Sequence, residues 1–266
     1  MIVDYYVMDP TGNITVLVCS AVPAEERVPV ADRLMEIEKD AEQVGYISRE
    51  DPATDISLNM AGGEFCGNAT LSTAAVYAYE SELSGDGTMP VTVNSSGAES
   101  PVKVDITRKD EKRFTGRAEM PFHAGCRDIT VEYGGAEYSF GEVSFKGIVH
   151  LISEAKLEKS LVEPLAEYCC NEMGADALGI MQIDAQACSL LPYVYVKKAN
   201  TGFWESSCAS GSTAAGYYLA KKTTGNKFSV EFSEPAGRLR IDCENDRLYL
   251  TGGVIIRDRK TAEILM

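Results

Sequence analysis

The sequence predicts an α+β protein made of two similar halves with a cleft between them. Each half contains a strand, a turn that includes glycine, a second strand and a helix, in that order. Each half then contains a cysteine followed by a helix of small residues, namely Cys66 in the first and Cys208 in the second. Two halves with one layout indicate a duplicated unit, and ligands bind preferentially in clefts between such units.

The composition is that of an ordinary globular protein. The 266 residues are 45% apolar and 24% charged, enough for one large domain or for two domains of about 130 residues. The net charge of −15 would be repelled by phosphate, so nucleic acids and anionic membrane surfaces are poor partners. We interpret the charge mainly as a source of solubility.

The N-terminal residues Met1–Tyr6 contain neither the basic segment nor the apolar segment of a signal peptide. No apolar run approaches the roughly 18 residues needed to span a membrane. Eight cysteines in this length are too few for a disulfide scaffold, which predicts reduced thiols and a cytoplasmic location.

The two halves can be followed element by element. Helical spacing of apolar residues predicts helices over 31–44 and 157–173, and two more helices follow the cysteines. Gly147 follows Gly12 by 135 residues, and Cys208 follows Cys66 by 142. Clusters of turn residues occur at 84–87 and at Gly134-Gly135. Short β-rich runs are predicted as strands at 14–19, 91–94, 102–106, 129–133, 149–152, 194–197, 228–232, 239–242 and 248–250.

Both cysteines stand at the predicted start of a helix. Cys66 precedes Gly67-Asn68 and Cys208 precedes Ala209-Ser210, and in each case an Ala/Thr/Ser-rich segment follows. Asn68 and Ser210 are good N-cap residues, which predicts that the helices begin there. The free N–H groups of such a helix end would lie beside the sulfur.

This geometry predicts two chemical properties. The positive helix end lowers the pKa of a thiol from about 8.5 towards neutrality, and it binds carboxylates. Two such turns facing each other would hold one carboxylate and place a sulfur on each side of the adjacent Cα. Racemisation requires a base on one face and an acid on the other, with donors to the developing negative charge. A lone cysteine is more often a small core residue, but two matched turns favour catalysis.

With these features the sequence resembles the diaminopimelate epimerase-like superfamily, which includes proline racemase and phenazine-biosynthesis-type isomerases. The resemblance depends on an ordered set of short motifs spread over most of the chain. The motifs are Gly12-Asn13, Cys66-Gly67-Asn68-Ala69, Gly147-Ile148-Val149-His150 and the segment 205–211 around Cys208.

The resemblance implies a two-domain fold, each domain being a curled mixed sheet around a central helix. The domains would span 1–120 and 121–256, with 257–266 returning to the first. It also implies cofactor-independent proton transfer between two cysteines, and a homodimer. Cysteine at both positions argues against the phenazine-type isomerases, which use carboxylates there. We expect no cofactor and no metal. The expected substrate-binding residues are Asn13, Gly67, Asn68, Glu205, Ala209 and Ser210.

The departures from the family pattern bear on the substrate. The epimerases carry an arginine before the second cysteine turn, whereas no arginine occurs from Asp128 to Gly237, and Ile148 replaces an asparagine. These differences favour a smaller amino acid with one carboxylate. Phe203, Trp204 and Glu205 are suited to stack on and hydrogen-bond an imidazole, as in the histidine racemases of the superfamily, although Trp204 is equally suited to packing. Histidine is therefore the expected substrate.

Other residues favour structural roles. We interpret His150 as structural, nothing marks His123 as catalytic, and Cys169-Cys170 indicates core packing. A cysteine protease would need a histidine partner and no second cysteine turn. The alternatives that stay open are a diaminopimelate epimerase, another isomerase of this fold, and a protein that binds an amino acid without catalysis.

Overall fold

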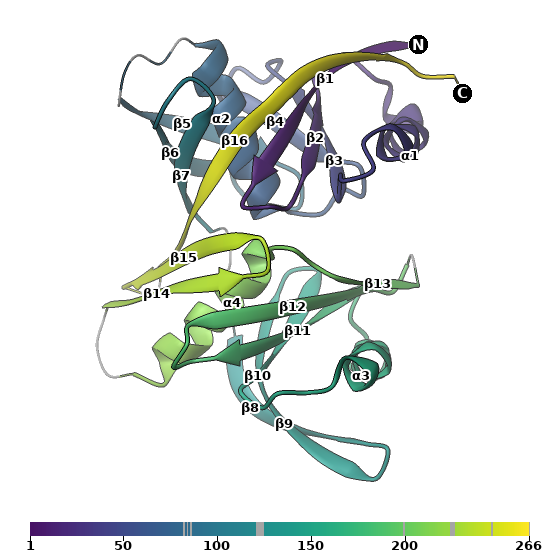
Figure 1. Ribbon diagram of the computed structural model, residues 1–266, viewed down its shortest axis with the longest axis vertical. Helices are drawn as coiled ribbons and strands as arrows, with labels where there is room; N and C mark the ends of the chain where they lie inside the picture. The colour runs from purple at the N-terminus through teal and green to yellow at the C-terminus, as the bar shows by residue number, and fades with distance from the viewer. Residues whose placement is uncertain are drawn as a thin grey trace. The chain divides into compact units, whose positions relative to one another are not determined.

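The computed structural model describes residues 1–81, 83, 85, 87–120, 125–198, 200–223, 227–245 and 247–265. Of the expectations above, those for Ser84, Asp86 and His123 lie outside these residues. The chain forms two compact units (Figure 1). Unit 1 contains Met1–Pro121 and Leu250–Met266, and unit 2 contains Phe122–Tyr249. Within the described ranges, no helix is both long and apolar enough to cross a membrane.

Unit 1 is a closed ring of eight strands. The strands follow one another in the sheet in chain order, and β16 pairs with β1 to close the ring. Pairs β2–β3 and β4–β5 are parallel, whereas β1–β2, β3–β4, β5–β6 and β6–β7 are antiparallel. The strands are β1 (Ile2–Pro10), β2 (Thr15–Val18), β3 (Gln43–Ser48), β4 (Ile56–Met60), β5 (Thr88–Ser95), β6 (Val102–Arg108), β7 (Arg113–Glu119) and β16 (Arg247–Glu263).

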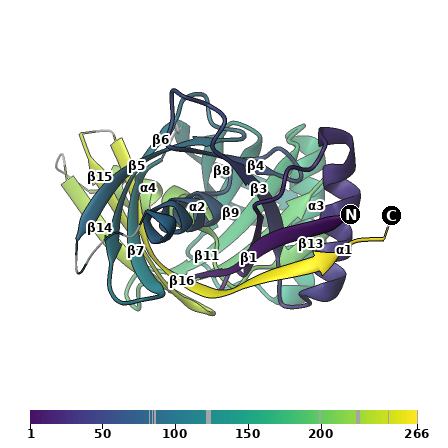
Figure 2. The same cartoon turned by 90° about the horizontal axis from the view of Figure 1, so that it is seen from above.

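Helix α2 (Gly67–Glu80) lies inside this ring (Figure 2). Eight of its 14 residues are Ala, Thr, Ser or Leu, and all but three of the 14 are buried. Small residues let the strands approach closely: a Cβ on Gly116 of β7 would lie 2.8 Å from Leu71 of the helix. The small-residue helix after Cys66 is therefore the central helix of its unit, as the resemblance implied.

Helix α1 (Arg27–Ile37) covers a second apolar cluster of unit 1. Its buried residues Val30, Ala31 and Leu34 pack with side chains of β1, β2 and β3. The helix predicted over 31–44 therefore starts earlier and ends earlier. Val44 belongs to β3, and its apolar spacing from the helix reflects the common core that both elements share.

Unit 2 repeats the same connections. Pairs β9–β10, β11–β12 and β14–β15 are antiparallel, and pairs β10–β11 and β12–β14 are parallel. The short strand β13 (Thr201–Trp204) pairs with β12 beside this path. The other strands are β8 (Gly125–Tyr133), β9 (Ala136–Phe145), β10 (Ile148–Ser153), β11 (Ala177–Asp184), β12 (Ser189–Val196), β14 (Lys227–Glu234) and β15 (Gly237–Glu244).

The helices of unit 2 occupy the positions of those in unit 1. Helix α3 (Lys159–Glu172) connects the parallel pair β10–β11, as α1 connects β2–β3. Helix α4 (Ala209–Lys221) precedes β14 and packs on β15, where a Cβ on Gly216 would lie 2.6 Å from Ile241. The predicted duplication of an α+β unit, with a mixed sheet and a central small-residue helix in each copy, is confirmed.

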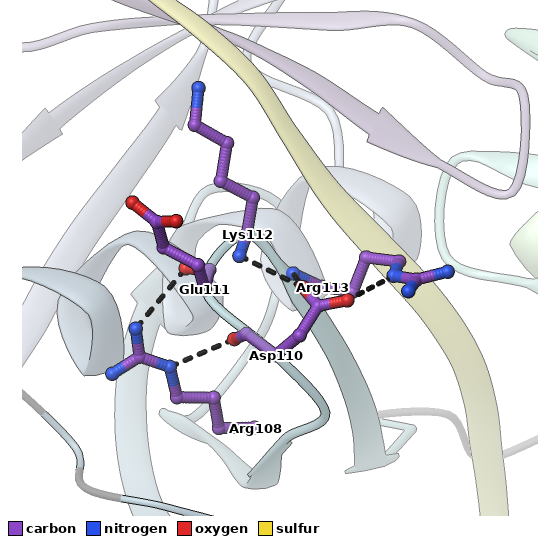
Figure 3. Close-up of polar contacts among 5 residues, drawn as sticks. All are labelled: Arg108, Asp110, Glu111, Lys112 and Arg113. Carbon is purple, nitrogen blue, oxygen red and sulfur yellow. Dashed lines mark hydrogen bonds and ion pairs between the residues drawn. The ribbon is translucent and has the colours of Figure 1, made fainter.

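Two hairpin turns show how local chemistry sets the strand ends. Between β6 and β7, Arg108 donates to the carbonyl oxygens of Asp110 (2.8 Å) and Glu111 (3.3 Å), and Asp110 accepts from the N–H of Lys112 (3.0 Å) (Figure 3). Between β8 and β9, Gly134 and Gly135 both have positive φ, at 62° and 78°. A two-residue hairpin turn of this type requires such values, so the predicted turn is confirmed there.

Candidate active site

Cys66 is the N-cap residue of α2. Its backbone is extended (φ −128°, ψ 114°), and its sulfur accepts a hydrogen bond from the N–H of Ala69 at 3.4 Å. Its carbonyl oxygen accepts from the N–H (2.9 Å) and the hydroxyl (2.8 Å) of Thr70. The cysteine is therefore held by the first turn of the helix, with its sulfur at the positive helix end.

Cys208 has the same arrangement at the start of α4. Its backbone angles are φ −124° and ψ 102°, its sulfur accepts from the N–H of Gly211 at 3.3 Å, and its carbonyl accepts from the N–H of Ser212 at 2.8 Å. The two cysteine turns thus match in backbone conformation and in hydrogen bonding. The prediction that Asn68 and Ser210 are the N-caps is wrong: the sulfur of each cysteine takes the place of a capping oxygen, so each helix starts one residue after its cysteine.

The electrostatics of Cys208 differ from the expectation. Cys208 is only 5% exposed, and this burial raises the pKa of its thiol well above the usual range. Glu205, which is hydrogen-bonded to the thiol, and Glu234 raise the pKa further, against the smaller opposite effect of the Gly211 N–H. The expectation of a lowered thiol pKa is therefore wrong for Cys208, because desolvation and two carboxyls outweigh the helix end. In the free protein this thiol keeps its proton.

Ser210 links Cys208 to a buried histidine. The Ser210 hydroxyl lies 3.7 Å from the Cys208 sulfur and 3.1 Å from Nε2 of His150 on β10. His150 is fully buried, and burial lowers its pKa to about 3. The ring is therefore neutral, and its contact with Ser210 supports the cysteine turn.

In unit 1 the expected binding residues lie at two places. Gly67 and Asn68 form the first turn of α2 and are buried. Asn13 lies in the turn between β1 and β2, where its amide donates to Glu42 and accepts from Gln43, each at 2.5 Å. The parallel pairing of β2 and β3 brings Glu42 and Gln43 next to Asn13. Because both residues lie about 30 positions after Asn13 in the sequence, sequence reasoning missed this network.

In unit 2 Ala209 and Ser210 form the first turn of α4, and Glu205 contacts Cys208. Trp204 packs with the apolar cluster under α3: its indole N–H donates to Glu163 at 3.0 Å, and its ring lies 5.1 Å from that of Tyr193. These contacts support packing as the role of Trp204. Phe203, by contrast, is 57% exposed.

Glu234 is a functional candidate that sequence reasoning missed. It ends β14 and is 6% exposed, and its carboxyl accepts from the N–H of Cys208 (2.7 Å) and from the hydroxyl of Ser212 (2.5 Å). A glutamate at the end of an alternating strand gives no local signal of such a role. Among the described residues, no three His, Cys, Asp or Glu side chains are grouped as a metal would need.

Comparison with known proteins shows the family of the chain. The family model described as the histidine racemase CntK N-terminal domain matches residues 2–257. The chain belongs to this family. A histidine racemase of Fusobacterium nucleatum subsp. nucleatum is 34% identical over 96% of this chain and 95% of its own length. A histidine racemase of Staphylococcus aureus is 30% identical over 82% of this chain and 80% of its own.

Solved structures share the fold. A hydroxyproline epimerase from Agrobacterium vitis, with bound trans-4-hydroxy-L-proline, has a TM-score of 0.69 at 12% identity, covering 98% of this chain and 91% of its own. The sequence relatives and the fold together identify the chain as an amino-acid racemase, an isomerase. The family resemblance, the fold class and the reaction class predicted from the sequence are confirmed.

Proposed function

We propose that the chain interconverts L- and D-histidine, with Cys66 and Cys208 as the two acid–base groups. The observation that carries this proposal is the matched pair of cysteine turns. Each sulfur caps the central helix of its unit through the N–H of the residue three positions on, at 3.4 and 3.3 Å. A structural cysteine would not need this geometry twice.

In the proposed reaction the thiolate of one cysteine takes the Cα proton of one enantiomer, so a C–H bond breaks and an S–H bond forms. The electron pair left on Cα is delocalised into the carboxylate. The thiol of the other cysteine then gives its proton to the opposite face and becomes a thiolate. The enzyme thus ends with its two protonation states exchanged, and exchange of protons with solvent restores the starting form.

The backbone donors of both helices would hold the substrate carboxylate. An α-helix does not satisfy its first four N–H groups internally, and such groups bind anions. We propose that the N–H groups of Gly67, Asn68, Ala209 and Ser210 bind the carboxylate. They would also stabilise the charge that develops when the proton leaves.

Histidine is proposed as substrate because both sequence relatives described above are histidine racemases. The absence of arginine from Asp128 to Gly237 agrees with a substrate that has one carboxylate. Glu205 and Asn13 are proposed to contact the amino group or the imidazole. Of the two, Glu205 lies next to the Cys208 thiol.

The test is α-proton exchange in D₂O with reduced protein and a panel of L-amino acids that includes histidine, proline and diaminopimelate. Proton NMR follows loss of the α-proton, and chiral chromatography follows the D form. We expect deuterium incorporation and D-histidine formation with histidine. Exchange with diaminopimelate alone would favour the epimerase alternative. Tight binding of histidine with no exchange would favour a protein that binds without catalysis.

A further inference from the structure

The two cysteine turns rest on equivalent polar contacts between helix and strand. Four residues after Cys66, the hydroxyl of Thr70 lies 3.2 Å from that of Ser95, the last residue of β5. Four residues after Cys208, the hydroxyl of Ser212 donates to Glu234, the last residue of β14, at 2.5 Å. Strands β5 and β14 hold the same place in the duplicated topology: β5 is parallel to β4, which precedes α2, and β14 is parallel to β12, which precedes β13 and α4.

The chemistry of these contacts differs between the units. Ser95 is neutral at every pH of interest, whereas Glu234 brings a carboxyl to the same position. That carboxyl is buried and also accepts the N–H of Cys208 itself at 2.7 Å. Cys208 therefore has a buried acid as a neighbour, whereas Ser95 occupies the equivalent position in unit 1.

We propose that Glu234 is a positioning residue that makes the two cysteines unequal: it fixes the Cys208 turn and, together with burial and Glu205, keeps Cys208 in the thiol form, so that Cys208 is the proton donor of the resting enzyme and Cys66 the base. The proposal rests on the two-cysteine function proposed above. Because the two forms of a racemase exchange in each turnover, the inequality concerns the resting state and not the overall equilibrium.

The groups that face Cys208 support this assignment. Glu205 approaches from the segment before α4, Glu234 from β14, and His150 from β10 through Ser210. His150 is neutral, so the two groups beside Cys208 that can become charged are both carboxyls. Burial raises the pKa of Glu234 to about 8, below that of the Cys208 thiol, so Glu234 ionises first. A thiolate at Cys208 would then be a second negative charge in one buried place.

The experiment measures alkylation of each cysteine by iodoacetamide as a function of pH, with peptide mass spectrometry and without substrate. In Glu234→Gln, which retains the shape of the side chain but not its charge, we expect the pH midpoint for Cys208 to fall, because the Glu234 carboxyl is one of the groups that raise the pKa of this thiol. The midpoint for Cys66 should not change. Glu231→Gln, an exposed glutamate on the same strand, is the matched control and should leave both midpoints unchanged.

A folded Glu234→Gln protein with the wild-type midpoint at Cys208 would overturn the proposal. Glu234→Ser, which introduces the residue found at the equivalent place in unit 1, is a second variant with the same expected shift. If neither variant folds, the wild-type protein decides: Cys208 must have a higher midpoint than Cys66, and equal midpoints contradict the proposal. Because no turnover is needed, this readout is independent of whether histidine is the substrate.

Discussion

A cysteine that caps a helix through its sulfur accepts a backbone N–H of the helix and also holds its thiol at the positive helix end. The sulfur of Cys66 or Cys208 accepts the N–H that an Asp or Ser oxygen usually accepts, and it is held at the positive helix end. For Cys208 this position does not suffice to stabilise the thiolate, because burial and the carboxyls of Glu205 and Glu234 act in the opposite direction. Burial and the neighbouring carboxyls, rather than the helix end alone, set the protonation state of this thiol.

The contact between His150 and Ser210 predicts a cost for removing the hydroxyl. In Ser210→Ala the buried Nε2 of His150 loses the partner that it has at 3.1 Å. Leaving a buried polar atom without a partner costs about 1–3 kcal/mol in the free energy of unfolding. Urea unfolding measures this loss, and Ser229→Ala on the exposed side of β14 is the control. Equal stability of both variants would contradict the role assigned to this contact.

Glu234 predicts a pH dependence of stability. Its folded pKa is about 8, above that of a glutamate in the unfolded chain. The unfolded chain therefore releases the proton at lower pH, and Glu234 costs stability as the pH rises from about 4 to about 8. Between about pH 5 and about pH 9, wild-type protein should lose about 1 kcal/mol or more of unfolding free energy relative to Glu234→Gln. Parallel curves for the two proteins would show that the folded pKa is not raised.

At the residue scale, sequence reasoning found the groups that share a local motif and missed those that meet only in the fold. Cys66 and Cys208 were identifiable because the residues around each cysteine form a recognisable turn. Glu234 reaches Cys208 across 26 positions of sequence, through the pairing of β12 with β14. Nothing in the residues next to Glu234 indicates that contact.

At the scale of elements, small residues let the central helices pack closely against the strands of their units. Helix α4 packs close to the sheet where it carries a glycine, as at Gly216 against Ile241 of β15. The sequence predicted these two helices and the duplication. It placed the helix at 31–44 too late in the chain, since Ala41 and Val44 contribute to the same apolar cluster from outside the helix. It also missed the short strands β3 and β4.

Gly211 provides a test of how tightly α4 is packed at the cysteine turn. A Cβ at this position would lie 2.2 Å from the sulfur of Met181 and 3.0 Å from that of Cys208. Gly211→Ala should therefore displace one of the two sulfurs, costing about 1–3 kcal/mol of stability, and lower kcat. Thermal unfolding and racemisation assays measure both effects. Gly253→Ala, where a Cβ would meet nothing within 4 Å, is the control and should behave as wild type.

At the scale of the whole molecule, the chain is a duplicated unit in which the final strand joins both copies. Strand β16 starts in unit 2 and closes the ring of unit 1 by pairing with β1. The cytoplasmic location expected from the cysteine content stays a prediction, and so does the homodimer implied by the resemblance.

Substrate binding should stabilise the molecule even when chemistry is removed. In the double variant Cys66→Ser/Cys208→Ser, L-histidine at about 100 times its Kd should add about 2.7 kcal/mol of stability, since a ligand that binds only the folded state shifts the unfolding equilibrium. The rise in Tm is measured by differential scanning fluorimetry, with L-leucine as the control ligand. Equal shifts with both amino acids would contradict recognition of the imidazole.

The most direct test of the two-cysteine claim compares wild-type protein with the single variants Cys66→Ser and Cys208→Ser. Each protein is given L-histidine and, separately, D-histidine in D₂O, and chiral chromatography follows formation of the opposite enantiomer. We predict that wild-type protein converts both, and that each variant loses about 10²–10⁴-fold or more of its turnover in both directions. Cys188→Ser, in the turn between β11 and β12, should retain wild-type turnover. Near-wild-type racemisation by either single variant would contradict the account.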